Sequence, residues 1–503
     1  MTDTHAYKQL EALFHKIHNL RHLASMAHWD SATMMPPGGS EARGEALAEI
    51  SSLINDLLGS PATGELLERA DQARDRLSAW EQANLREMKR EWFNASSVTS
   101  ELVRRHAIAS SRCENAWRSL REQNNWKDFQ PLLSEVIELT REQAAMRSDA
   151  SGLSPYDALL NLYEPGQLSS QLDAVFSRLK AFLPSFVMHI AEQQKADVLV
   201  QPAGQFPAEK QKALAMELME AVGFDFQHGR LDTSHHPFCG GVPEDVRITT
   251  RYSNNDFSES LMGVLHETGH AKYEQGLPRK WISQPVGRAR SMGIHESQSL
   301  FQEMQICRGQ AFLQFCAPLM HRHLGNGQTP DSCWDADNLY QLYNRVKPGY
   351  IRVNADEASY PLHVILRYEL EQDLISGSLK VADIPEAWNE KMQAYLGLPT
   401  KDNYRDGCMQ DIHWTHGMLG YFPTYTLGAM NAAQLYQAAN QSITSLDEQI
   451  SRGDFLALNQ WQAENIWSWG SYHSTDALMQ QATGEILNPD HFIRHLRERF
   501  TPA

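Results

Sequence analysis

The chain has 503 residues, of which 42% are hydrophobic and 21% charged, and its formal net charge is −17. This composition is typical of a globular protein and excludes a largely disordered chain. The negative charge argues against nucleic acid or an anionic membrane as a partner. Six scattered cysteines without a CxxC pair predict neither a disulfide framework nor a thiolate zinc site.

The first part of the sequence is predicted to be helical. The first twenty residues have an amphipathic pattern without the apolar stretch of a secretory signal, and no segment approaches about 18 apolar residues. We therefore expect a cytoplasmic protein without a transmembrane helix. Residues 41–60 place leucines and isoleucines on one stripe and end at Gly59. Residues 169–194 repeat the pattern, and Pro184 is expected to kink or divide that helix.

The helical pattern stops at residues 232–252. Within this segment, residues 246–252 (VRITTRY) alternate β-branched and polar side chains, which favours a strand. Such a strand could dock a peptide by strand addition, and simple structural pairing is an equally good interpretation. Further helices are expected over 295–316, around 350–376 and in a C-terminal set.

No convincing linker detaches a domain, so we expect a single domain over residues 1–503. Along the chain it would comprise a helical lid region over about 1–150, a core over about 200–430 and C-terminal helices over about 431–503.

Residues 265–276 have the sequence LHETGHAKYEQG, with two histidines four residues apart. On a helix, His266 and His270 project from one side and can reach a single cation at about 2.0–2.1 Å. Glu267 is rotated off that line by about 100° and can handle the proton of a water molecule. The apolar residues 261–265 predict a buried helix, where two unligated imidazoles would be costly.

A catalytic zinc ion needs three protein ligands and one open position. Tyr273 and Gly276 stand where the metzincin subclass would need glycine and histidine, so that subclass is excluded. Three side chains at the start of the next predicted helix could supply the third ligand: His295, Glu296 and Glu303. Spacing alone favours Glu296 over His295 and Glu303 only weakly, and Glu274 is a candidate partner for a histidine.

Several short motifs accompany the two-histidine helix. They are HPF (236–238), DVRIT (245–249), HETGH (266–270), HESQ (295–298), IRVNAD (351–356) and GCMQDIHW (407–414), preceded by HWDSATMMPPGG (28–39). In this order the motifs resemble those of the carboxypeptidase Taq family of HExxH metallocarboxypeptidases. Six ordered motifs are highly specific, whereas one HExxH is not.

The resemblance implies a mainly α, saddle-shaped fold with a deep groove, usually as a homodimer. The strand expected over 246–252 adds a small β element before the HExxH helix. It implies release of C-terminal residues from peptides with a free C-terminus, with broad specificity and poor cleavage next to proline. It also implies one Zn²⁺ ion per subunit, often replaceable by Co²⁺, on His266, His270 and Glu296. Glu267 would then be the general base.

An exopeptidase must recognise a free carboxylate, and a guanidinium matches two carboxylate oxygens. Arg352 in IRVNAD is the first candidate and Arg247 in DVRIT the second, although an arbitrary arginine more often forms a solvated salt bridge. Asp356, one turn beyond Arg352, would orient it or merely pair with it.

Candidates for a donor to the oxyanion of the reaction are His413 in QDIHW and a tyrosine in GYFPTY, Tyr421 or Tyr425. The alternative for His413 is a core histidine beside Trp414. Two other functions fit the HExxH motif: a helical zinc oligopeptidase that cuts inside short peptides, and a non-enzymatic helical scaffold.

Overall fold

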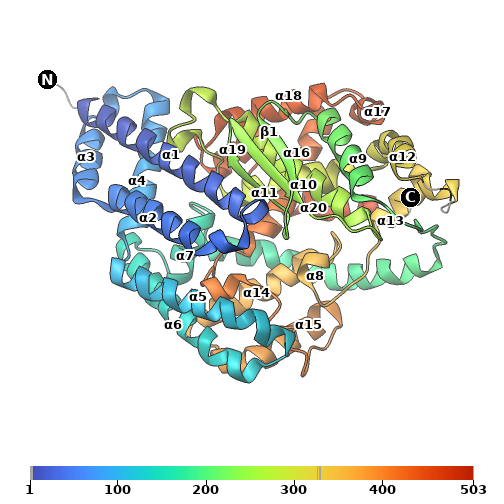
Figure 1. Ribbon diagram of the computed structural model, residues 1–503, viewed down its shortest axis with the longest axis horizontal. Coiled ribbons are helices and arrows are strands. Elements are labelled where there is room, and N and C mark those ends of the chain that lie inside the picture. The colour runs from blue at the N-terminus through green and yellow to red at the C-terminus, as the bar shows by residue number, and fades with distance from the viewer. Residues whose placement is uncertain (1–3, 326, 328–329, 502–503) are drawn as a thin grey trace. The chain divides into compact units, whose positions relative to one another are not determined.

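The computed structural model describes residues 4–325, 327 and 330–501, and it is mainly helical with one small sheet, as expected (Figure 1). The chain forms two compact units. The first comprises Met1–Ser96, Leu199–Tyr343 and Asn431–Leu487, and the second Ser97–Val198, Asn344–Met430 and Asn488–Ala503. Because each unit combines three separate stretches, the units do not follow the sequential division expected from the sequence. The single domain stays a prediction.

The helices of the first unit are α1 (Thr4–Thr33), α2 (Ser40–Gly59), α3 (Pro61–Gln72), α4 (Ala79–Ser96), α9 (Ala208–Ala221), α10 (Ser258–Gly276), α11 (Met292–Leu300), α12 (Gln310–Leu324), α13 (Ala336–Tyr343), α17 (Leu446–Ser451), α18 (Leu456–Asn465) and α19 (Thr475–Thr483). Those of the second unit are α5 (Ser100–Glu122), α6 (Trp126–Ser151), α7 (Pro155–Tyr163), α8 (Ser169–Gln193), α14 (Tyr360–Ser376), α15 (Ile384–Leu396) and α20 (Pro489–Phe500). Helix α16 (Pro423–Ser442) is shared between the two units: its residues up to Met430 belong to the second unit and those from Asn431 to the first.

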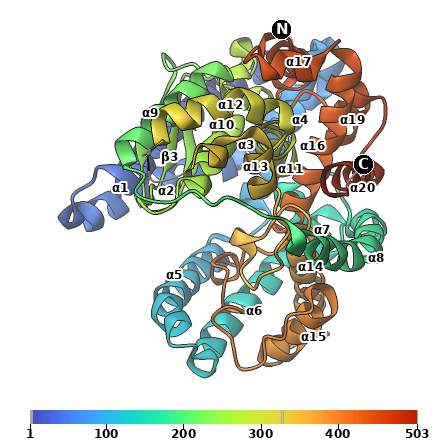
Figure 2. The same cartoon turned by 90° about the vertical axis from the view of Figure 1, so that its right-hand side faces the viewer.

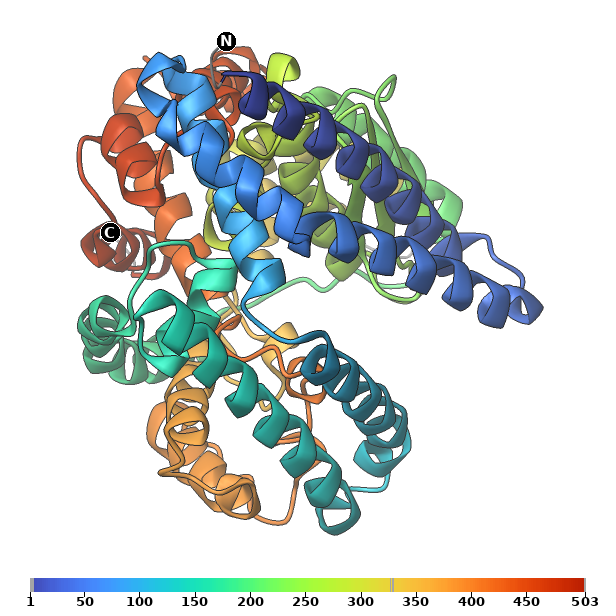
Figure 3. The same cartoon turned by 90° about the vertical axis from the view of Figure 1, so that its left-hand side faces the viewer.

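The N-terminal helices of the first unit share a core. Helices α1 to α4, drawn in shades of blue, lie together (Figure 3). Helix α1 buries Tyr7, Leu10, Phe14 and Ile17, which recur at three- and four-residue intervals and pack with apolar residues of α2, α3 and α4. The helix predicted over 41–60 is confirmed as α2, which ends at Gly59 as expected.

Three strands form the sheet: β1 (Gly229–Thr233), β2 (Phe238–Val242) and β3 (Asp245–Thr250). The predicted strand is confirmed as β3, which lies in the centre, parallel to β1 and antiparallel to β2. Strand addition to this segment is therefore wrong, because the backbone groups on both sides of a central strand are already paired.

The sheet places α10 on one face and α1 on the other. Helix α10 lies beside β3 (Figure 2). Side chains alternate along a strand, so Val246 and Ile248 share a face, where they pack with Val264 and Ala271 of α10. Arg247 points to the opposite face, where its guanidinium lies 4.2 Å from the ring centroid of Trp29 on α1. The apolar residues of the DVRIT motif thus pack against the HExxH helix.

The helix predicted over 169–194 is confirmed as α8; Pro184 lies inside it and does not divide it, and the alternative of a kink there stays a prediction. One helix prediction needs correction. The stretch 295–316 is not one helix but α11, a π-helix over Phe301–Cys307 and α12. A bond from the backbone NH of Arg308 to the carbonyl of Glu303, 3.0 Å long, closes the wider turn. Among the described residues, no helix is both long and apolar enough to span a membrane.

Candidate metal centre

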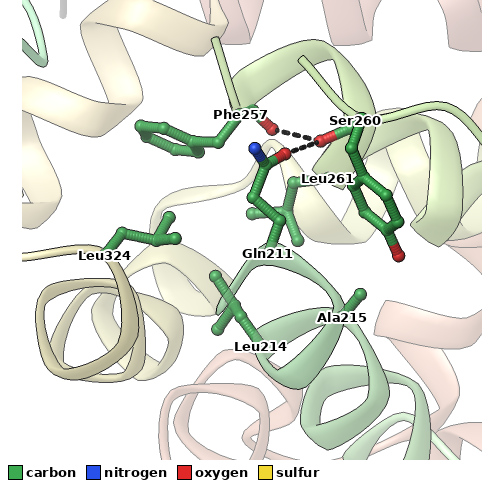
Figure 4. Close-up of a pocket in the computed structure, with 8 residues that line it drawn as sticks. Gln211, Leu214, Ala215, Phe257, Ser260, Leu261 and Leu324 are labelled. Atoms are coloured by element: carbon green, nitrogen blue, oxygen red, sulfur yellow. Dashed lines mark hydrogen bonds between the residues drawn. The ribbon is translucent and has the colours of Figure 1, made fainter. Parts of the chain in front are cut away.

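A buried glutamine anchors the start of α10. The amide nitrogen of Gln211, on α9, donates to the carbonyls of Phe206 and Ser253 at 2.6 and 2.7 Å. Its amide oxygen lies 2.6 Å from Oγ of Ser260, which is also 3.0 Å from the carbonyl of Phe257 (Figure 4). Through Ser260 this amide joins the first turn of α10 to α9, and through Ser253 it holds the chain that leads into α10.

Further along α10, a glycine allows close contact with α11. A Cβ atom on Gly269 would lie 2.4 Å from the carbonyl oxygen of Gln298 and 2.6 Å from Cα of Ser299. Only a residue without a side chain permits this approach of two backbones. The contact lies one residue before His270 and two residues after Glu296, so it sets how far apart those side chains are.

We expect Gly269→Ala to destabilise the protein by at least about 1–3 kcal/mol, because an added methyl group must push backbone away. Gly263, on the same helix, is the matched control, since a Cβ there meets nothing within 4 Å. Gly263→Ala should stabilise by up to about 1 kcal/mol through helix propensity. Thermal unfolding and metal content of both variants check this; equal tolerance of the two would contradict the close contact.

The two motif histidines and Glu296 converge. The ring centroids of His266 and His270 are 5.0 Å apart. One ligand atom from each of these three residues lies within 4.8 Å of the other two, and Nε2 of His270 is 3.7 Å from Oε2 of Glu296. In the part of the chain that the structure describes, no other three His, Cys, Asp or Glu side chains meet in this way.

His295, one of the alternatives for the third ligand, supports His270 instead. Its carbonyl lies 3.1 Å from Nδ1 of His270, so that nitrogen carries the proton and donates. The ring of His295 stacks on that of His270 with centroids 4.5 Å apart, and its Nε2 is 2.9 Å from Oε1 of Glu274. Glu274 is therefore the partner of His295, and Nε2 of His270 keeps its lone pair for a metal ion.

Glu303, the other alternative, holds His266 in the same way. Its Oε2 lies 3.0 Å from Nδ1 of His266, and its Oε1 accepts a hydrogen bond of 2.7 Å from Arg308. Arg308 is held in turn by the carbonyl of Tyr343 at 2.9 Å. A carboxylate on the far nitrogen is the usual outer support of a metal-binding histidine. Two imidazole nitrogens and one carboxylate match the donors that zinc takes.

We expect Glu296→Gln to abolish tight metal binding, whereas Glu303→Gln should weaken it about 10–100-fold. A glutamine at 303 offers one oxygen to two donors, His266 and Arg308, so one of them loses its acceptor. Competition with a chelator at fixed pH measures both affinities. The reverse order of losses would identify Glu303 as the ligand.

Acidic side chains concentrate negative charge at this site. Burial lowers the pKa of His270 well below its ordinary value, so its ring is neutral. Burial also lowers the pKa of His266, but the hydrogen bond to Glu303 and the charge of Glu296 outweigh it and raise the pKa to about 9. Burial raises the pKa of Glu267 to about 7, with His266 opposing the rise. Three carboxyl groups around two imidazoles favour a cation between them.

The predicted carboxylate-binding arginine lies in the second unit. Arg352 stands on a 3-10 turn, Arg352–Asn354, and donates from Nε to Asp411 at 2.9 Å and from Nη1 to the hydroxyl of Tyr360 at 2.7 Å. The other oxygen of Asp411 accepts from Nε of Arg367 at 2.6 Å. Burial alone would raise the pKa of Asp411, but the two guanidinium groups hold it below its usual range.

The cluster of Arg352, Arg367 and Asp411 is buried and contains two positive charges and one negative charge. Arg352 is 5% exposed and Arg367 is 0% exposed, and both share the single carboxylate of Asp411. Sequence reasoning missed Asp411 and Arg367. Asp411 lies inside the GCMQDIHW motif, which was its only signal, and nothing in the sequence around Arg367 indicates its role.

The two other candidates for substrate binding already have partners. Asp356 does not touch Arg352, because the 3-10 turn ends at Asn354 and the chain changes direction. Its carboxylate accepts from the backbone NH of Lys347 at 3.0 Å and from the hydroxyl of Ser359 at 2.7 Å. Arg247, in the first unit, donates from Nε and Nη2 to the two oxygens of Asp245 at 2.9 and 2.7 Å.

The candidate oxyanion donors gather in the second unit. Nε2 of His413 lies 3.2 Å from the hydroxyl of Tyr425, and its ring centroid is 5.4 Å from that of Tyr421. Nδ1 of His413 is buried without a hydrogen-bond partner among the described residues. Burial and the charge of Arg352 lower the pKa of His413 to about 4, so the ring is neutral. Its other neighbour, Trp414, donates to Glu371 instead.

Comparisons with known proteins agree with this geometry. The model of the carboxypeptidase Taq (M32) metallopeptidase family matches residues 9–500. The chain is 37% identical to thermostable carboxypeptidase 1 of Thermus thermophilus and 34% identical to carboxypeptidase 1 of Bacillus subtilis, with 99% of each chain covered.

Solved structures show the same fold. Metallocarboxypeptidase 1 of Trypanosoma cruzi superimposes with a TM-score of 0.96 at 45% identity, over 99% of both chains. The carboxypeptidase of Pyrococcus furiosus superimposes with a TM-score of 0.92 at 32% identity, over 98% of this chain and 99% of the other. The predicted mainly helical metallopeptidase fold is thus confirmed, and the alternative of a non-enzymatic scaffold is not supported. The chain belongs to the carboxypeptidase Taq (M32) metallopeptidase family and is a metallocarboxypeptidase.

Proposed function

We propose that the protein removes residues one at a time from the free C-terminus of peptides, using one Zn²⁺ ion per subunit, with Co²⁺ as a substitute. The ion is held by His266, His270 and Glu296. The observation that carries this proposal is the meeting of their three donor atoms within 4.8 Å, with Nδ1 of each histidine already occupied. Family membership supports the exopeptidase over the related endo-oligopeptidase.

In the proposed mechanism His266, His270 and Glu296 would hold a divalent ion, which would supply Lewis-acid chemistry for the peptide carbonyl and for a water molecule. Glu267 accepts the proton of the attacking water on its carboxylate and passes it to the nitrogen of the leaving residue. It can do so because it is next to His266 on α10, while other groups occupy Nδ1 of the two histidines: Glu303 at His266 and the carbonyl of His295 at His270.

Substrate recognition is assigned to the second unit. The surplus positive charge on Arg352 and Arg367 suits the terminal carboxylate, with Arg352 as the group that binds it. His413, Tyr421 and Tyr425 are proposed as donors to the oxyanion, Arg247 as a second anion-binding arginine, and Asp356 as a substrate-binding residue through the turn that it stabilises.

The proposed specificity is broad for the released residue and poor next to proline. Proline fixes its own φ angle and restricts the residue before it, so fewer conformations of such a peptide suit the site. We also propose a cytoplasmic homodimer. All six cysteines are free, which is typical of a reducing compartment, and the dimer rests on the resemblance to the family.

Incubation of zinc-loaded protein with a ten-residue peptide and its C-terminally amidated twin tests the proposal. Mass spectra over time should show stepwise loss from the C-terminus of the free acid, a stop before proline, and no cleavage of the amide. Internal cleavage of both peptides would instead support the endo-oligopeptidase.

A further inference from the structure

A short segment of the second unit presents both Arg352 and its hydrogen-bond partner Tyr360. At one end, the backbone NH of Arg352 donates to the side chain of Gln410 at 2.8 Å, and its Nε to Asp411. These bonds hold only the start of the segment 351–360, because the 3-10 turn ends at Asn354. Other contacts must hold the residues that follow.

Glu357, in the middle of this segment, points away to the C-terminal helix. Its Oε1 lies 2.7 Å from Nε2 of His495 and its Oε2 accepts from Nη1 of Arg499 at 3.0 Å. The side chains of Glu357 and Arg499 are only 4% and 7% exposed. His495 and Arg499 stand one turn apart on α20, so one face of that helix takes both oxygens of the carboxylate. Buried charge-assisted bonds of this kind are directional and hold their partners firmly.

Helix α20 has its own attachment to α8, independent of Glu357. It contacts α8 and buries Phe492, Leu496 and Phe500. Asp490 on its first turn forms an ion pair with Arg178 of α8. The helix is therefore a fixed support, and Glu357 connects the Arg352 segment to it.

We propose that Glu357, with His495 and Arg499 of α20, positions Arg352 for the substrate carboxylate. This inference rests on the proposed function of Arg352. Glu357 is a positioning residue: the bonds from α20 fix the chain five residues after Arg352, and the hydroxyl of Tyr360, three residues later, accepts from Nη1 of Arg352. Without this support the segment can shift, and the guanidinium loses its alignment with the two oxygens of the substrate.

The test uses the double variant Glu357→Gln, Arg499→Met in the full-length zinc-loaded protein. Removing both charges avoids leaving one of them buried without a partner. We expect KM for a free-acid peptide to rise about tenfold with kcat nearly unchanged, because carboxylate binding acts equally on the bound substrate and the transition state. Metal content should equal that of the wild type. Arg499→Lys, which keeps the charge, should recover most of the loss.

Arg178→Met is the matched control, since it removes an ion pair of α20 that does not involve Glu357. It should keep the KM of the wild type. The proposal is overturned if the double variant has the KM of the wild type, if Arg178→Met raises KM as much, or if kcat and metal content fall together. A wild-type protein that leaves the free-acid peptide intact would refute the proposed function itself, which is a different result from an active enzyme with an unchanged KM.

Discussion

Replacing Glu267 with glutamine should leave metal binding intact and lower kcat about 10²–10⁴-fold, the usual contribution of a general base. Glutamine has the same shape and can still accept a hydrogen bond, but it cannot take up a proton. The three proposed ligands, His266, His270 and Glu296, are untouched by the change. Zinc content measured alongside the rate of release of C-terminal residues checks both parts.

Glu274→Gln is the control for this experiment. It removes the same charge from the same helix, but the Glu274 carboxylate bonds to His295 rather than facing a reacting group. We expect a much smaller loss of kcat. Equal losses in the two variants, or full activity of Glu267→Gln, would contradict the role of Glu267 as the base.

The metal centre was predictable from the sequence wherever one helix determines it. A four-residue spacing fixes His266 and His270 on one face as soon as the helix forms, and α10 forms over Ser258–Gly276. The third ligand depends on how a separate segment returns to α10, which spacing does not fix. The backbone contact at Gly269 lets α11 approach and brings Glu296 beside His270, which supports Glu296 as the proposed third ligand.

The sheet was predictable only in part for a similar reason. Alternation of β-branched and polar residues identifies β3, but the position of a strand within a sheet depends on partners elsewhere in the chain. The π-helix at Phe301–Cys307 has no sequence signature, yet it contains Glu303, the residue that supports His266.

The cluster around Arg352 shows the same limit more strongly. The motif IRVNAD identifies the arginine, and a helical interpretation of the segment suggested Asp356 as its partner. The 3-10 turn places Asp356 elsewhere, and the partner is Asp411, 59 residues away in sequence. Arg367, which is fully buried and bonded to the same carboxylate, gives no signal because a charged residue on a helix normally predicts an exposed face.

Arg352→Met should lower kcat/KM for free-acid peptides roughly 30- to 5,000-fold. This corresponds to the loss of about 2–5 kcal/mol of binding free energy in the transition state. The fold should survive, because Asp411 keeps Arg367 as its partner and no buried charge is left alone. The sharpest measurement is the ratio of kcat/KM for a free-acid peptide to that for its amide. If Arg352 binds the carboxylate, this ratio falls toward one in the variant.

Arg367→Met removes the same charge from the same carboxylate and serves as the matched control. The Arg367 side chain is 0% exposed, so it cannot touch a substrate, and its loss leaves Arg352 paired with Asp411. We expect this variant to unfold at a lower temperature, since a well-packed guanidinium is lost, but to keep its preference for the free acid. An equal loss of the preference in both variants would mean that the cluster acts through its net charge. A preference that persists in Arg352→Met would mean that the guanidinium of Arg352 does not hold the carboxylate.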